Sequence, residues 1–159
     1  MCSSDLESLS GLVSGVISGF LILGVTYIIN IFDNKRKKQA EKEFLLAKEE
    51  IKNVGELRKR VDDCLILIDE IKKSDSEVSR NTKIKNILDN SLLIIELIYM
   101  GMFNDENFEL LSKENEPIHE NILKISVKKD DDLLDTITEQ LIAFKITLMR
   151  IKKVMYLKI

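Results

Sequence analysis

The first apolar pattern in the chain is an unbroken run from residue 9 to residue 32 that contains no charged side chain. As a helix, these 24 residues would rise about 36 Å, whereas the hydrocarbon core of a bilayer is about 30 Å thick. The run is therefore long enough to span a membrane with some tilt. We predict one transmembrane helix over residues 9–32, preceded by a short N-terminal segment, residues 1–8.

Beyond this run, apolar residues recur at alternating spacings of four and three, which is typical of helices packed along a narrow seam. The first seam is Leu57, Val61, Cys64, Ile68 and Ile71. The second, expected on the most buried helix, is Ile84, Leu88, Ser91, Ile95, Ile98 and Met102, broadened by Ile87 and Ile94. The last is Leu134, Ile137, Leu141, Phe144, Leu148, Ile151 and Met155. We expect this last helix to pack antiparallel to the first or the second.

Breaks in these patterns suggest where helices begin and end. Gly55 is a possible kink, and Asn104 can cap a short helical turn. Pro117 suits the first position of another helix, and the acids Asp130 to Asp132 suit the start of the last one. The prediction is an all-α chain in which the transmembrane helix continues through a basic collar and helical connector, residues 33–56, into an antiparallel helical bundle, residues 57–159.

The predicted span carries small residues at strict four-residue spacing. Gly11, Gly15 and Gly19 would form a groove that lets helix backbones approach closely, which is how helices associate in lipid. A neighbouring stripe is polar at every position but one and should face protein or water: Ser10, Ser14, Ser18, Ile22, Thr26 and Asn30. The two stripes together favour an oligomeric ring or bundle, with a dimer and a lone anchor as the alternatives.

Charges beside the run predict its orientation. Asp5 and Glu7 precede it, and the cations Lys35, Arg36, Lys37 and Lys38 follow it. Cytoplasmic flanks collect Lys and Arg, so we expect a single-pass protein of the cell's inner membrane with its N-terminus outside and its bundle in the cytoplasm. The four cations should also attract anionic lipid headgroups, by about 1 kcal/mol per charge. A cleaved signal peptide would have a basic start and a shorter run.

The remaining composition offers little chemistry. Cys2 and Cys64 are too few for a disulfide scaffold or a zinc site, and Cys64 sits in an apolar run typical of a buried, reduced thiol. The only histidine, His119, lacks the further ligands of a di-iron or zinc helix and is expected at the surface near a helix start. No glycine-rich phosphate loop is present. We predict no enzyme activity, catalytic residue, metal, cofactor or small-molecule substrate.

The combination of a glycine-rich span, a basic collar at Lys35 to Lys38 and a small helical domain resembles one family. It is similar to the small membrane accessory proteins of prokaryotic antiviral systems, in particular the pore-forming accessory of type VI-B CRISPR loci with its divergent HEPN-like helical domain. The resemblance implies an oligomer that depolarises the membrane of an infected cell beside an RNA-guided nuclease. It also implies that Gly11, Gly15 and Gly19 pack the ring. The residues that would line its lumen are Ser14, Ser18, Ile22, Thr26 and Asn30.

Two other classes of function stay open. The chain could be a non-conducting, membrane-tethered adaptor that recruits a cytoplasmic partner through its bundle. It could also carry a HEPN-like domain that binds RNA, although HEPN ribonucleases have an arginine shortly before the histidine and the nearest upstream arginine here is Arg80. A second basic run, residues 150–158, could bind an acidic partner or RNA, although its position favours a solvated helix end.

Overall fold

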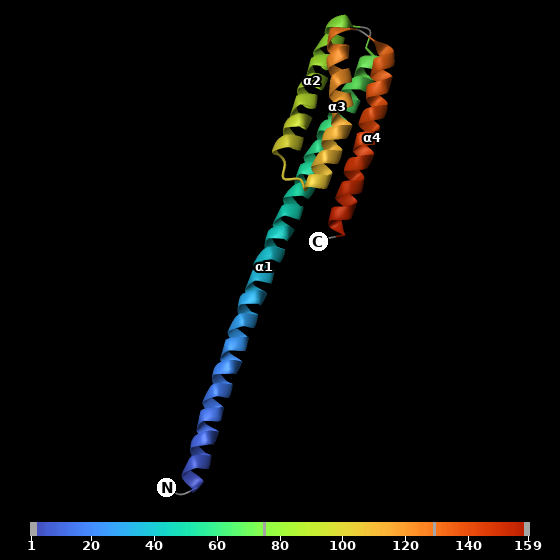
Figure 1. Cartoon of the computed structure of the whole chain (residues 1–159). Coiled ribbons are helices and arrows are strands. Elements are labelled where there is room, and N and C mark those ends of the chain that lie inside the picture. Colours follow the sequence, from blue (N-terminus) through green and yellow to red (C-terminus); the bar gives the residue numbers. More distant parts are fainter. Residues whose placement is uncertain (1–2, 75, 129, 158–159) are drawn as a thin grey trace. The chain divides into compact units, whose positions relative to one another are not determined.

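The computed structural model of the chain describes the backbone of residues 3–74, 76–128 and 130–157 and, within these ranges, the side chains from Leu23 onward. The described residues form four α-helices and no strand, so the all-α prediction is confirmed. The helices are α1 (Ser3–Lys72), α2 (Glu77–Met100), α3 (Asp105–Val127) and α4 (Asp131–Tyr156) (Figure 1). The chain divides into two units, residues 1–44 and 45–159, and α1 contributes to both.

The second unit is an antiparallel four-helix bundle in which each helix lies beside the next one along the chain. Polar contacts mark all four neighbouring pairs, including α4 with α1, which closes the square. They are Arg60 to Asn90 (3.4 Å), Ser91 to His119 (2.6 Å), Asn121 to Gln140 (3.1 Å) and Lys145 to Asp62 (2.5 Å). Helices α2 and α4 are therefore diagonal partners, on opposite sides of the bundle (Figure 1). The expected antiparallel packing of the last helix on the first is confirmed.

The core follows the predicted seams most closely in α1 and α4. All seven seam residues of α4 are buried, from Leu134 to Met155. In α1 the five predicted residues are buried too, and the same spacing continues backward to Val54 and Glu50. The packed part of the chain thus begins before residue 57. Gly55, the possible kink, lies inside the continuous helix α1.

Helix α2 uses a different seam from the predicted one. Ile87 and Ile94 are buried, whereas Leu88 and Ile95 are only partly buried and Met102 lies beyond the helix, exposed. Five residues of α2 are buried against seven of α4, so α2 is not the most buried helix. The reason is that α2 is apolar on more than one face, and a broad stripe does not identify which edge faces the core.

Helix α3 is continuous, which corrects the prediction of short segments with a new start at Pro117. Asn104 does cap α3, since its side chain accepts a hydrogen bond of 2.9 Å from the backbone N–H of Asn107. Pro117 lies inside the helix on its exposed side, where water can solvate the carbonyl group that proline leaves without a partner. Packing of the buried residues on either side, Asn115 and Ile118, outweighs the local cost.

In the first unit the described backbone is helical, and the described side chains, those of residues 23–44, are all exposed. Large apolar side chains occupy most positions up to Phe32, and charged or polar ones occupy most positions from Asp33 to Glu43. A hydrogen bond of 3.0 Å from Gln39 to Glu43 supports the helix in the polar part. The composition therefore changes abruptly at residue 33 while the helix continues.

Candidate functional site

The predicted membrane span lies largely outside the described side chains, which begin at Leu23. This applies to the predicted packing glycines and to three of the predicted lumen residues: Gly11, Gly15, Gly19, Ser14, Ser18 and Ile22. Of the remaining two, Thr26 and Asn30 have exposed side chains on α1. Within the residues whose side chains are described, no helix has an apolar stretch long enough to cross a bilayer. The span and its pore therefore stay predictions.

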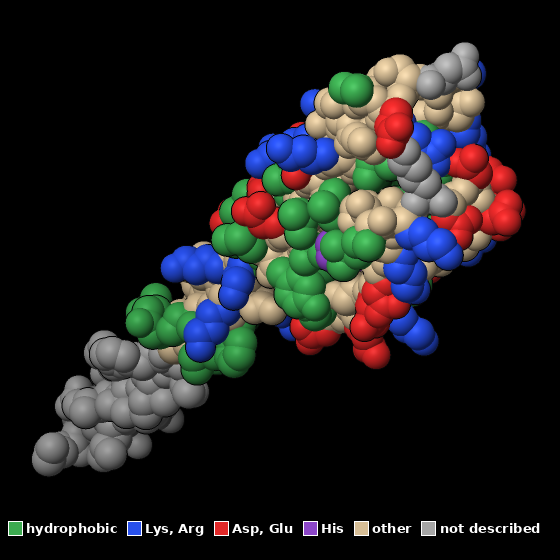
Figure 2. Space-filling view, turned by 90° about the horizontal axis from the view of Figure 1, so that it is seen from above, with side chains coloured by type: hydrophobic (Ala, Val, Ile, Leu, Met, Phe, Trp, Pro, Cys, Tyr) green, Lys and Arg blue, Asp and Glu red, His purple; other side chains and the backbone are tan. Residues whose placement is uncertain are grey.

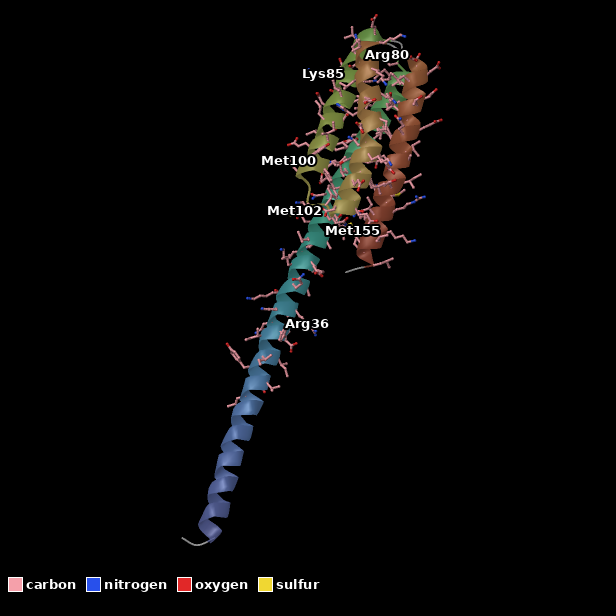
Figure 3. All side chains as sticks on the ribbon, in the orientation of Figure 1. Arg36, Arg80, Lys85, Met100, Met102 and Met155 are labelled. Carbon is pink, nitrogen blue, oxygen red and sulfur yellow. The ribbon has the colours of Figure 1, made fainter. Side chains whose placement is uncertain are left out.

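The basic collar is a solvent-accessible feature of α1. Lys35, Arg36, Lys37 and Lys38 are all exposed, and Figure 3 shows the side chain of Arg36 extending from the helix. Consecutive helical residues are about 100° apart, so four cations in a row surround the helix rather than mark one side of it. The collar therefore presents positive charge on all sides of α1.

The one histidine of the chain lies in the middle of α3 rather than at a helix start. Its Nδ1 atom is 2.6 Å from the Ser91 hydroxyl oxygen of α2, and the two groups share a hydrogen bond. His119 is partly buried and Ser91 is 1% exposed. A substrate could not approach the serine oxygen without separation of the helices, so the pair satisfies two polar groups between helices and is not arranged for nucleophilic attack.

A groove between α2 and α3 borders this pair. It has a volume of about 580 Å³, and its lining includes Ile95, Tyr99, Phe108, Glu116 and His119. The Tyr99 and Phe108 rings meet edge to face with centroids 5.5 Å apart, and Figure 2 shows hydrophobic side chains gathered around the histidine. No cluster of three potential metal ligands occurs among the described residues. The groove is thus an apolar surface with a polar edge.

A second groove, of about 510 Å³, lies between α1 and α2 and combines acidic and apolar side chains. Its charged residues are the carboxylates Glu49, Glu56 and Glu96 and one cation, Arg60, and its apolar residues are Leu93, Leu97, Met100 and Met102. Methionine-rich apolar surfaces are typical of sites that bind amphipathic helices. Among these carboxylates, the Glu96 side chain is exposed.

The polar network around Glu50 was missed by sequence reasoning altogether. This buried carboxylate accepts hydrogen bonds from the side chains of Asn104 (3.1 Å) and Asn107 (2.7 Å). Glu50 occupies a core position of the α1 seam, where spacing alone predicts an apolar residue. A charged residue at such a core position is the sequence signal that could have predicted buried hydrogen-bond partners for Glu50.

Cys64 is the free thiol described in the bundle, and it is fully buried. Burial raises the pKa of Cys64 to about 12, the nearby Asp63 carboxylate adds to the rise, and Arg60 opposes it. The neutral thiol is poorly nucleophilic, so this cysteine behaves as a core residue. The sequence prediction of a buried, reduced Cys64 is confirmed.

Comparison with models of protein families, with curated proteins and with solved structures gives no match.

Proposed function

We propose that this protein is a membrane-anchored oligomer whose N-terminal helix lies in the bilayer and whose helical bundle lies in the cytoplasm. One observation carries the proposal: seven large apolar side chains between residues 23 and 32 are 38–69% exposed on α1. They are Leu23, Val25, Tyr27, Ile28, Ile29, Ile31 and Phe32. Fully burying one such side chain contributes about 1.5–3 kcal/mol, so a run of this density favours an apolar surrounding.

The exposed collar directly after this run supports lipid as that surrounding. Lys35 to Lys38 would lie at the headgroups of the cytoplasmic leaflet, with the N-terminus outside. The resulting topology is that of a single-pass protein of the inner membrane.

Assembly through the span would give the oligomer its activity. Gly11, Gly15 and Gly19 pack neighbouring helices, while the polar stripe that contains Thr26 and Asn30 faces a lumen. The proposed outcome is membrane depolarisation in antiviral defence, beside an RNA-guided nuclease. Support for this finer proposal comes from the sequence pattern and from the resemblance in layout.

A non-conducting adaptor is the second candidate, and the bundle favours it with a specific observation. The α1–α2 groove presents three carboxylates beside exposed Met100 and Met102, a surface suited to a protein partner. In this version the span serves only to hold the bundle at the membrane. Replacing residues 9–32 with an unrelated single span separates the two candidates, because an adaptor keeps its activity and a pore loses it.

Gly15→Leu is the sharpest test of assembly through the span. The added side chain would block the proposed close approach, and the particle mass of the full-length protein in nanodiscs should fall to that of a smaller species. Gly24→Leu is the matched control, because it places the same side chain in the same helix off the glycine stripe, where a Cβ meets nothing within 4 Å. An unchanged mass for Gly15→Leu would remove the basis of the ring.

A further inference from the structure

The outer face of α4 is apolar where a solvated helix should be polar. Four side chains on this face are 41–59% exposed: Ile142, Ile146, Met149 and Tyr156. Their spacing of four, three and seven residues places them on one stripe, turned away from the buried seam of the same helix. The cations Arg150 and Lys153 are exposed beside the stripe. The C-terminal half of α4 therefore presents a basic, apolar surface, here called the α4 face.

The outer surface of helix α2 has the opposite charge. Its outer side chains Leu92, Leu93, Tyr99 and Met100 are 37–78% exposed. Glu96 lies among them, and the adjoining groove adds Glu49, Glu56 and the cation Arg60 from α1, so carboxylates outnumber cations there. An exposed apolar patch with a net charge at its edge is typical of a protein interface. We call this surface the α2 face.

The two faces lie on opposite sides of the bundle and at the same end of it. Helices α2 and α4 are diagonal in the square of four helices, so their outer sides point in opposite directions (Figure 1). Both helices run in the same direction, and both faces occupy their C-terminal halves. Figure 3 places Met100 of α2 and Met155 of α4 toward the same end of the bundle.

We propose that the partner of the α2 face is the α4 face of a second copy of this chain. Apolar stripes meet at the centre of the contact, and Glu96 meets the cations Arg150 and Lys153 at its edge. An unrelated partner would explain one face, whereas a second copy explains why two faces of opposite charge are matched in level. Because the two faces of one copy differ, the contact is heterologous and repeats from copy to copy.

This inference rests on the proposed membrane anchoring, and it deepens that proposal. Copies anchored in one bilayer are parallel to one another, so faces at the same level of the bundle meet side by side. A heterologous contact closes into a ring when its rotation allows and otherwise gives an open row. The bundle contact would then support the same oligomer as the glycine stripe of the span, from the cytoplasmic side.

Cysteine cross-linking of the full-length protein in nanodiscs tests the contact directly. In a Cys2→Ser background, copies with Leu93→Cys are co-expressed with copies that carry Met149→Cys, and the buried Cys64 is retained. A cross-linked dimer is expected from the mixture and from neither variant alone. Lys85→Cys, on the outer side of α2 toward its other end, replaces Leu93→Cys as the matched control and should give no product with Met149→Cys (Figure 3).

Charge reversal supplies an independent readout. Glu96→Lys and Lys153→Glu should each weaken assembly roughly fivefold, measured as the concentration at which half of the protein is oligomeric, and the double variant should restore it. Circular dichroism of each variant confirms that the bundle is folded. Both residues are exposed, so the substitutions leave the core unchanged.

The outcomes separate this inference from the proposed function. An oligomer that persists without the Leu93–Met149 cross-link would overturn the heterologous contact and leave the membrane-anchored oligomer standing. Cross-linking of Leu93→Cys copies with one another would also overturn it, because that product requires a symmetric contact. A wild-type protein that is monomeric in nanodiscs would overturn both.

Discussion

Glu50 and Asn104 join helix α1 to the start of α3 across 54 residues of sequence. The Glu50 carboxylate accepts a hydrogen bond of 3.3 Å from the backbone N–H of Asn104, and further bonds from the Asn104 and Asn107 side chains. Asn104 is also the N-cap of α3. One buried carboxylate therefore provides hydrogen-bond partners for polar groups at the turn between α2 and α3. It also holds the N-cap residue of α3 in place and so fixes where α3 begins.

Replacing this carboxylate should lower the stability of the bundle. In Glu50→Ala the two asparagine side chains and one N–H group lose a charged partner, and we expect the free energy of unfolding to fall by about 2–3 kcal/mol. Glu49→Ala is the control, since Glu49 is more exposed and, among the described residues, its ion pair is with Lys52 of its own helix; it should cost under about 0.5 kcal/mol. Urea titration of the full-length protein in detergent, followed by circular dichroism, measures both. Equal losses would show that the network does not stabilise the bundle.

Alanine substitutions at two glycines of the bundle should change its free energy of unfolding in opposite directions. At Gly101 a Cβ atom would lie 2.3 Å from the Leu97 carbonyl oxygen and 2.4 Å from a ring carbon of Phe103, so the turn after α2 must shift. At Gly55, inside α1, a Cβ meets nothing within 4 Å. We expect Gly101→Ala to lower the free energy of unfolding by about 1–3 kcal/mol. Gly55→Ala should raise it by about 0.5–1 kcal/mol.

The same denaturation measurement checks both glycine variants. A stabilising Gly101→Ala would mean that the turn has room that the backbone does not indicate. A destabilising Gly55→Ala would mean that α1 needs conformational freedom at this point.

The sequence pattern predicts the bundle best where a helix has one apolar seam. In α4 the seam from Leu134 to Met155 is complete, and every predicted position is buried. In α2 further apolar positions lie on the outer surface, so spacing could not rank Ile87 above Leu88. At Pro117 a local rule favoured a helix start, but the packing of α3 against its neighbours determines the outcome.

Long-range polar contacts could not be predicted in the same way. Ser91 and His119 are 28 residues apart, and only the antiparallel packing of α2 and α3 brings them together. Glu50 and Asn107 are separated by 57 residues and meet for the same reason. The outer stripe of Ile142, Ile146 and Met149 was visible in the sequence, yet spacing alone does not distinguish a second contact surface from the edge of a core.

The hydrogen bond between Ser91 and His119 should be measurable as a coupling free energy between the two residues. His119→Ala leaves the buried Ser91 hydroxyl without this partner and should cost about 1–3 kcal/mol. Adding Ser91→Ala should cost less in that background than in the wild type, by about 1 kcal/mol in a double-mutant cycle. Additive losses would indicate no direct coupling. The same His119→Ala protein tests the RNA-cleaving alternative, because full biological activity in a folded variant would argue against a catalytic histidine.

We predict that the buried Cys64 thiol makes the bundle less stable at alkaline pH. Its pKa is about 12 in the folded chain, above the ordinary value of 9.0, because burial disfavours the thiolate. The stabilisation from the neutral thiol is therefore complete below about pH 9 and is lost as the pH rises toward 12. Between pH 8 and pH 10.5 this single group should lower the free energy of unfolding by about 2 kcal/mol.

Lysine and tyrosine side chains also titrate in this range, so the informative quantity is the difference between the wild type and Cys64→Ala. The alanine variant lacks the thiol and begins with a cavity cost of about 1 kcal/mol, which does not depend on pH. Raising the pH under reducing conditions should erase the advantage of the wild type and then reverse it. Urea titrations at pH 8 and pH 10.5 measure the change. Parallel losses in the two proteins would show that the Cys64 thiol ionises equally in the folded and unfolded chain, and that its burial in the described core is less complete than the packing of α1 indicates.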